Sequence, residues 1–305
     1  MKVAVTGATG FIGRPLVRAL IARGHAVTAL TRSAKHAGDL ATRVVETDLE
    51  AAAQLTPILD GHDAILHLAG EPIAARRWDA RQKQRIRDSR VESTRAIVEA
   101  LAAASSRPRV LITASGIDIY PFAHGPLDDD EVTEADAPAD SFLARVCRDW
   151  EREAFAAEPL GVRVAALRTA LVLGPGGALA RLETPFKLFA GGKVGSGRQW
   201  VSWIHRDDLV NAYIAAVTDG RYTGPVNAVT DSTRNAELSS AIGRALHRPS
   251  WLPVPAFALK VAVGELAESI LNGRRAVPTK LRALGFAFEH PDLDEAVASA
   301  ITASR

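Results

Sequence analysis

Residues 2–24 read KVAVTGATGFIGRPLVRALIARG, and this stretch decides the fold. Residues 3–6 are a short apolar run typical of a buried strand. Three glycines follow at intervals of three residues, and apolar residues then recur with the period of a helix. Glycine allows positive φ and lets backbone N–H groups approach a diphosphate at the positive end of that helix. The pattern predicts a dinucleotide-binding turn formed by Gly7, Thr9, Gly10, Phe11, Ile12 and Gly13.

The segment after the second predicted strand, residues 26–30, indicates which dinucleotide is bound. It reads Thr31-Arg32-Ser33-Ala34-Lys35 and contains no carboxylate. An acidic side chain here binds the ribose hydroxyls of NAD, whereas a basic one accommodates the 2′-phosphate of NADP. Arg32 offers a planar fork suited to a phosphate, and the hydroxyls of Thr31 and Ser33 add donors. The segment therefore favours NADP(H), and the alternative is a solvated basic loop.

Two further strand ends are expected beside the cofactor. Asp48 and Leu49 either contact the adenine or start a helix over residues 50–59 with Asp48 as its cap. Residues 63–70 predict a fourth parallel strand that ends in small residues, where backbone passes close to the ribose. From this strand end we assign Ala69 and Gly70 to the cofactor site.

Strands and helices continue to alternate up to about residue 170. An amphipathic helix is predicted over residues 91–104, followed by strands over residues 110–115 and 162–168. Because right-handed crossovers join parallel strands, their carboxyl ends meet along one crevice. We therefore predict an α/β fold with a doubly wound parallel Rossmann sheet, and we place Thr113 in the cofactor site.

Length and composition narrow the class of protein. The chain has 305 residues, 47% hydrophobic and 24% charged, which suits a globular protein of two lobes. The formal net charge is +2 and no basic face is concentrated, so no nucleic-acid partner is expected. No apolar run reaches the roughly 20 residues of a membrane span, so no membrane association is expected. The single cysteine, Cys147, and a strand in place of an N-terminal leader favour a cytoplasmic protein.

Short motifs spread over most of the chain carry a family resemblance. They are Gly7 to Gly13, His67-Leu68-Ala69-Gly70-Glu71-Pro72-Ile73, Ser89-Arg90-Val91, Phe142-Leu143-Ala144, Trp150-Glu151, Pro185-Phe186, Gly195-Ser196-Gly197 and Ser202-Trp203-Ile204-His205. The chain resembles the atypical short-chain dehydrogenase/reductases called epimerase family proteins, which are similar to nucleoside-diphosphate-sugar epimerases. Its tail resembles that family's C-terminal domain of unknown function. The resemblance implies NADP contacts from Thr31, Arg32, Leu68, Ala69, Arg90 and the backbone around Leu171 and Val172.

The usual proton donor of a short-chain dehydrogenase is missing. Such enzymes use a tyrosine and a lysine four residues later, which lowers the tyrosine pKa. Four residues after the three tyrosines, Tyr120, Tyr213 and Tyr222, come His124, Val217 and Val226. When Trp150-Glu151 is matched to the family, Leu143 and Cys147 fall where the pair would be.

Two hydroxyl groups remain as candidate proton donors. Ser115 ends a predicted strand, and Tyr120 lies in the loop that follows. Each either donates to the substrate or serves packing and hydrogen bonding inside the protein. Cys147 is interpreted as a small buried residue of a helix.

After residue 170 the chain becomes rich in glycine, aromatic and basic residues, which predicts a smaller α/β cap. Trp200 and Trp203 either line a substrate pocket or belong to a core. Asp207 and Asp208 are read as N-terminal residues of a helix over residues 209–217. Further helices are expected near residues 235–246 and 256–271. The predicted substrate-binding residues are Glu71, Trp200, Trp203 and His205, and no metal site is predicted.

These observations predict two domains and leave three functions open. Residues 1–170 and 205–232 are expected to form the NADP-binding domain, and residues 171–204 and 233–305 the cap. The leading function is an NADP-dependent oxidoreductase acting on a small molecule that the sequence does not identify. The alternatives are a nucleotide-sugar epimerase and a non-catalytic NADP sensor, the latter because the tyrosine-lysine pair is absent. The oligomeric state stays open.

Overall fold

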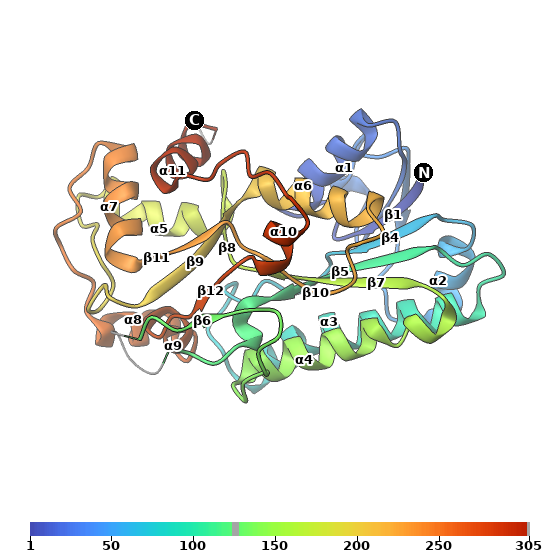
Figure 1. The fold of residues 1–305 in the computed structure, drawn as a ribbon, viewed down its shortest axis with the longest axis horizontal. Helices are drawn as coiled ribbons and strands as arrows, with labels where there is room; N and C mark the ends of the chain where they lie inside the picture. The colour runs from blue at the N-terminus through green and yellow to red at the C-terminus, as the bar shows by residue number, and fades with distance from the viewer. Residues whose placement is uncertain (124–127, 304–305) are drawn as a thin grey trace.

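The computed structural model describes residues 1–123 and 128–303, so His124 lies outside the described residues. Within them, the largest sheet has seven parallel strands in the order β10-β7-β5-β4-β1-β2-β3 (Figure 1). The strands are β1 Lys2–Thr6, β2 Ala26–Thr31, β3 Arg43–Glu46, β4 Ala64–His67, β5 Val110–Gly116, β7 Arg163–Thr169 and β10 Gly224–Ala228. The prediction of a doubly wound parallel sheet is confirmed.

Helices cover both faces of this sheet. Helices α1 (Gly13–Ala22) and α6 (Arg206–Thr218) share an apolar core with one face (Figure 1). Helices α2 (Ala52–Leu59), α3 (Ala80–Ala103) and α4 (Phe142–Phe155) pack on the other. From the junction of β1 and β4 the sheet grows in two directions: β2 and β3 follow on the β1 side, and β5, β7 and β10 follow on the β4 side. In open α/β sheets this switch point is where ligands bind, at the carboxyl ends of the strands.

A second, smaller layer is built on a three-stranded sheet with the strand order β11-β9-β8. Its strands are β8 Leu171–Leu173, β9 Trp200–His205 and β11 Asp231–Arg234, and the helices that share its core are α5 Gly177–Lys187, α7 Asn235–Leu246 and α11 Leu293–Thr302. Strand β6 (Glu131–Val132) pairs with β12 (Arg275–Ala276), close to α8 (Ala256–Val263) and α9 (Leu266–Leu271) (Figure 1). Short 3-10 turns are η1 Ala34–His36, η2 Ile117–Ile119 and η3 Glu158–Leu160.

Several helix bounds differ from the prediction. The helix expected over residues 91–104 begins at Ala80, because the Asp79 carboxylate caps it by accepting the Gln82 N–H at 2.6 Å. The helix expected over residues 256–271 is two helices, because Gly264 between them has a φ of +65°. None of the described helices combines the length and apolar character needed to cross a membrane.

The C-terminal part of the chain returns to the large sheet. Leu281, on helix α10 (Thr279–Ala283), is fully buried in the core that α1 and α6 share. The Asp208 carboxylate at the start of α6 accepts the backbone N–H groups of Glu289 (2.6 Å) and His290 (3.1 Å). The two-domain division stays a prediction, but residues 279–290, which it assigns to the cap, contact the predicted nucleotide-binding layer.

Candidate functional site

The turn between β1 and α1 leaves no room for side chains at its glycines. Gly7 has a φ of +65°, and a Cβ atom there would lie 2.8 Å from the backbone carbon of Leu68. A Cβ atom at Gly13 would lie 2.1 Å from the Gly7 carbonyl oxygen, and at Gly10 3.1 Å from that oxygen. The glycines therefore bring the turn against the end of β4, at the switch point of the sheet.

The same turn keeps donors available for an anion. The Gly10 N–H bonds the Gly7 carbonyl at 2.9 Å, but the N–H groups of Phe11 and Ile12 meet no acceptor among the described residues. Helix α1 has no side-chain cap and no acidic residue in its first turn. Unpaired amides at the positive end of a helix suit the diphosphate of a dinucleotide. Thr9 lies half-buried in this turn.

The end of β2 presents an unpaired cation. Arg32 is exposed and has no hydrogen bond or ion pair with any described residue. The Thr31 hydroxyl donates to the Ser33 carbonyl and accepts the Ser33 N–H, both at 3.3 Å, which fixes the loop. The Glu46 carboxylate accepts the Ala34 N–H at 2.8 Å and is thereby partnered. The arrangement fits a phosphate group beside Arg32.

The alternative that made Asp48 a helix cap is wrong. Helix α2 begins at Ala52, its N-cap is Ala51, and no side chain caps it. The Asp48 carboxylate instead accepts the Glu50 N–H at 3.1 Å within a turn, and Asp48 stays exposed. Leu49 is buried in the core beneath α2. The adenine contact predicted for this pair stays a prediction.

The end of β4 is tied to β1 by one hydroxyl. Thr6 Oγ1 accepts the N–H groups of Leu68 (3.1 Å) and Ala69 (3.2 Å) and bonds His67 Nδ1 at 2.7 Å. Burial lowers the pKa of His67 to about 3, so this histidine is a neutral core residue. These hydrogen bonds therefore fix the end of β4 beside the turn at Gly7.

Arg90 reaches the same place from α3. A Cβ atom at Gly70 would lie 3.1 Å from the Arg90 guanidinium carbon, so the guanidinium lies in tight contact with this glycine. Arg90 donates to the Glu71 carbonyl at 3.0 Å and lies over the Trp150 ring at 5.3 Å. Burial lowers the pKa of Arg90. The side chain of Glu71 accepts from Gln82 at 3.5 Å and is half-buried.

Ser115 and Tyr120 belong to a buried polar network at the ends of β5 and β7. The Ser115 hydroxyl donates to Glu151 Oε1 at 2.7 Å. Arg168 holds both Glu151 oxygens, through Nε and Nη2 at 2.8 Å each. Its Nη1 donates to the Tyr120 hydroxyl at 2.7 Å, and that hydroxyl donates to Asn227 Oδ1 at 2.7 Å.

Electrostatics in this network oppose proton release from the tyrosine. Burial raises the pKa of Tyr120 to about 12, although Arg168 acts in the opposite direction. Leu143 and Cys147 are buried on α4, and burial raises the pKa of the Cys147 thiol to about 12. The interpretation of Cys147 as a buried helical residue is confirmed. Thr113 is buried on β5 and its hydroxyl donates to the Ala114 carbonyl at 3.1 Å.

Among the residues predicted to bind substrate, the two tryptophans differ. Trp203 is buried in the core of the second layer, so the core alternative holds for it. Trp200 is half-buried, lies 3.7 Å from the Arg234 guanidinium and 4.9 Å from that of Arg275, and donates to the Asp128 carbonyl. Leu171 and Val172 are half-buried on β8.

His205 caps a helix. Its Nδ1 accepts the Asp207 N–H at 3.2 Å, and its ring lies 3.8 Å from that of His290. In the described residues, ligand atoms of His205, Asp207 and His290 lie within 4.8 Å of one another, close enough to hold a metal ion. The Nδ1 lone pair already serves the backbone, which leaves the other ring nitrogen protonated in the neutral form. Burial lowers the pKa of His205 to about 4.

Sequence reasoning missed two groups of residues near the site. The ring of Phe11 sits against Gly174, Gly176 and Gly177, where added Cβ atoms would approach it to between 3.0 and 3.9 Å. The run Gly174-Pro175-Gly176-Gly177 was the available signal. The ion pair of Arg168 with Glu151 was also missed, and its signal was a charged residue at the end of an otherwise apolar strand.

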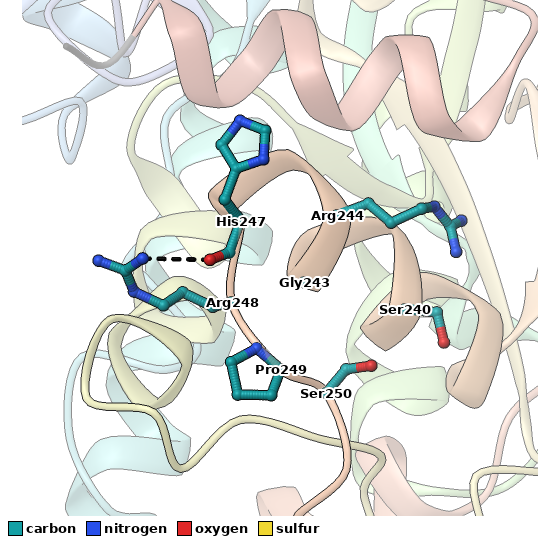
Figure 2. Close-up of a pocket in the computed structure, with 7 residues that line it drawn as sticks. All are labelled: Ser240, Gly243, Arg244, His247, Arg248, Pro249 and Ser250. Atoms are coloured by element: carbon teal, nitrogen blue, oxygen red, sulfur yellow. Dashed lines mark hydrogen bonds between the residues drawn. The ribbon is translucent and has the colours of Figure 1, made fainter.

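A surface pocket lies elsewhere, at the C-terminal end of α7 (Figure 2). It is lined by Ser240, Gly243, Arg244, His247, Arg248, Pro249 and Ser250. Figure 2 shows the side chains of His247, Arg244 and Arg248 pointing away from one another, and Arg248 donates to the His247 carbonyl. None of these residues belongs to the predicted site.

The sheet order and the glycine turn at its switch point define a Rossmann-type nucleotide-binding protein. Residues 3–228 match the family described as the NAD dependent epimerase/dehydratase family, and residues 254–300 match a domain of unknown function, DUF1731. The chain belongs to the NAD dependent epimerase/dehydratase family.

Relatives match over nearly the whole chain. The chain is 40% identical to "Epimerase family protein SDR39U1 homolog, chloroplastic" of Arabidopsis thaliana, over 97% of this chain and 86% of that protein. It is 36% identical to "Epimerase family protein YfhF" of Bacillus subtilis, over 99% and 98% of the two chains. The crystal structure of human epimerase family protein SDR39U1 (isoform 2) with NADPH is similar with a TM-score of 0.87 and 30% identity, covering 99% of each chain. The resemblance inferred from the sequence motifs is confirmed.

Proposed function

We propose that this protein is an NADP(H)-dependent oxidoreductase that reduces a small carbonyl compound or activated alkene. The observation that carries the proposal is the pairing of an uncapped, glycine-lined helix start with the unpaired guanidinium of Arg32. The first suits a diphosphate, and the second suits a phosphate on the adenosine ribose. The similar human protein, crystallised with NADPH, supports NADP(H) over NAD.

The residues proposed to hold NADP(H) follow the ends of the strands. The proposed set is Gly7, Thr9, Gly10, Phe11, Ile12, Gly13, Thr31, Arg32, Ser33, Asp48, Leu49, Leu68, Ala69, Gly70, Arg90, Thr113, Leu171 and Val172. When bound, NADPH supplies a hydride to the substrate carbon. Gly7 lets the turn pass against the end of β4, because a Cβ atom there would collide with the backbone of Leu68 and Ala69.

We propose that Ser115 acts on the substrate oxygen through a bound water molecule and that Tyr120 takes no part. The Ser115 hydroxyl donates a hydrogen bond to Glu151, whose two oxygens also accept from Arg168, so the lone pairs of Oγ remain to accept a hydrogen bond from water. A water molecule that donates one hydrogen bond to Oγ has a second hydrogen for the substrate oxygen; it passes that proton to the reduced oxygen, and bulk solvent reprotonates the hydroxide that is left. Both hydrogen-bonding functions of the Tyr120 hydroxyl are engaged with Arg168 and Asn227, and its pKa is raised to about 12. Tyr120 is therefore a structural residue in this proposal.

Calorimetric titration of the full chain with NADPH and with NADH tests the cofactor. We expect NADPH to bind at least about ten times more tightly, which corresponds to about 1.4 kcal/mol. Single-turnover oxidation of bound NADPH by aldehydes, ketones and activated alkenes tests the chemistry. Tight NADPH binding without oxidation by any of these compounds would favour the non-catalytic sensor. Absence of binding to either dinucleotide would overturn the whole proposal.

A further inference from the structure

Arg274 is a second buried arginine, and it enters the site region from the C-terminal part of the chain. The residue is 6% exposed and directly precedes β12. Its backbone is fixed, because its carbonyl accepts the Ser202 hydroxyl at 3.0 Å and the preceding Gly273 lies against Trp200. A Cβ atom at Gly273 would lie 1.9 Å from the Trp200 carbonyl oxygen. The backbone is thus fixed both before and at Arg274, and this determines where its guanidinium lies.

Part of the Arg274 guanidinium has a partner and part does not. Its Nη1 donates to Asp118 Oδ1 at 2.7 Å, and its guanidinium carbon lies 4.7 Å from the centre of the Phe122 ring. Its Nε is buried and has no hydrogen-bond partner among the described residues, and no described residue accepts from Nη2. A buried donor without an acceptor is costly, so an acceptor from outside the chain is expected there.

The contrast with Arg168 shows what kind of acceptor fits. In Arg168 the Nε and Nη2 groups together hold the two oxygens of the Glu151 carboxylate. These two groups lie on one edge of the planar guanidinium, and their spacing matches the two oxygens of a carboxylate. Arg274 presents the same edge without a carboxylate from the described chain. Asp118 occupies only the Nη1 position of Arg274.

Arg274 also lies near the proposed substrate end of the cofactor site. Its partner Asp118 is three residues beyond Ser115, on the turn η2 that follows β5. A Cβ atom at Gly116 would lie 3.8 Å from Asp118 Oδ2 and 3.5 Å from Cys147 Sγ, so this turn packs closely on α4. The Asp118 side chain keeps 26% of its surface exposed and the Arg274 side chain 7%, so the ion pair meets solvent on its Asp118 side.

We propose that Arg274 binds a carboxylate group of the substrate through Nε and Nη2, while Asp118 holds the guanidinium in place from Nη1. The substrate class is then a small organic acid that carries the reducible group elsewhere in the molecule. The inference rests on the proposed function for the reduction, but the carboxylate site itself is tested without turnover. Asp118 acts as a positioning residue whose negative charge also weakens anion binding.

Equilibrium titrations with benzoate, benzamide and inorganic phosphate, on the full chain with and without NADPH, test the site. We expect benzoate to bind and benzamide, which is neutral and similar in shape, to bind at least about tenfold more weakly. Arg274→Gln should weaken benzoate binding about 10- to 100-fold, the range for hydrogen bonds to a charged group. The control is Arg275→Gln, which removes the same charge one residue away and should leave benzoate affinity unchanged.

A second variant tests the proposal even if Arg274→Gln does not fold. Asp118→Asn removes the competing charge and keeps an oxygen for Nη1, so benzoate should bind several-fold more tightly. A purely structural ion pair predicts no such gain. Equal affinity for benzamide, an unchanged benzoate affinity in Arg274→Gln, or tighter binding of phosphate than of benzoate would overturn the proposal. Benzoate binding that depends on Arg274 in a protein that never oxidises NADPH would support the carboxylate site and overturn the reductase.

Discussion

Two regions at the carboxyl ends of the central strands differ in whether their polar groups have hydrogen-bond partners within the protein. At the ends of β5 and β7, Ser115, Glu151, Arg168 and Tyr120 satisfy one another in the protein interior. At the ends of β1 and β2, the amides of the glycine turn and the Arg32 guanidinium have no acceptor among the described residues. Satisfied polar groups contribute to folding, whereas unsatisfied ones are available to a ligand. Substitutions in the first region should change stability, and those in the second should change ligand affinity.

The largest expected effect is on the buried ion pair. Glu151→Gln leaves Arg168 charged and unpaired in the interior, and the free energy of unfolding should fall by about 3–5 kcal/mol. Urea unfolding measures this change. The control is Glu153→Gln on the same helix, whose partner Arg95 is 41% exposed, and it should cost less than about 1 kcal/mol. Equal losses in the two variants would contradict the comparison.

Ser115 is the residue of the first region that we expect to affect turnover. Ser115→Ala removes the acceptor that holds the proposed water molecule at the substrate oxygen and should lower kcat about 100-fold, which corresponds to about 2.7 kcal/mol. Tyr120→Phe keeps the ring and should lower the free energy of unfolding by about 1 kcal/mol, with kcat unchanged. Single-turnover oxidation of NADPH separates the two variants. A loss of kcat in Tyr120→Phe alone would assign the catalytic contact to the tyrosine instead.

Two buried histidines predict how stability depends on pH. The pKa of His205 is lowered to about 4 and that of His67 to about 3, chiefly by burial, so the folded protein stays unprotonated at both in mild acid. The unfolded chain takes up protons near pH 6.5, so the stability is complete above that pH and is lost as the pH falls toward 4. Each histidine adds a slope of up to about 1.4 kcal/mol per pH unit.

Urea unfolding between pH 7.5 and pH 5 measures this slope. His205→Asn keeps an oxygen that can accept the Asp207 N–H and should remove about half of the slope. His36→Ala, at an exposed histidine, is the control and should leave the slope unchanged. A wild-type stability that does not vary over this range would show that neither histidine is held neutral.

The smallest expected effect on ligand binding or turnover lies at the cofactor's adenosine end. Arg32→Ala should weaken NADPH binding about tenfold, or about 1.4 kcal/mol, because Arg32 is exposed and its charge is screened. NADH affinity and the melting temperature of the free protein should not change. Arg18→Ala, an exposed arginine on α1, serves as the control in calorimetry. A parallel loss for NADH would mean that Arg32 does not read the 2′-phosphate.

The first of the two regions was hard to predict from sequence, and the second was easy. The turn at Gly7 to Gly13 is local, because a strand, three glycines and a helix follow one another within 22 residues. The other network joins Tyr120, Glu151, Arg168 and Asn227, which only the finished sheet brings together. Pattern and period identify elements, but they do not say which distant side chains will meet.

Helix α11 was not predicted, although the sequence contains a signal for it. Its cap Asp292 accepts the Glu295 N–H at 3.0 Å, and Val297, Ala300 and Ile301 lie buried on one face. An acidic cap followed by apolar residues at helical spacing is a readable signal. The break at Gly264, in contrast, depends on a left-handed φ that an isolated glycine permits but does not require.

The path of the chain between the layers limits how the protein opens. The backbone passes from the large sheet to the small one between β7 and β8, back between β9 and α6, and across again between β10 and β11. It crosses a fourth time after β12, where residues 279–290 pack against α6, and a fifth time between residue 290 and α11. Separating the two layers as rigid bodies would strain all five links at once. We therefore expect a reactant to enter by movements of side chains and loops, while the two layers keep their relative position.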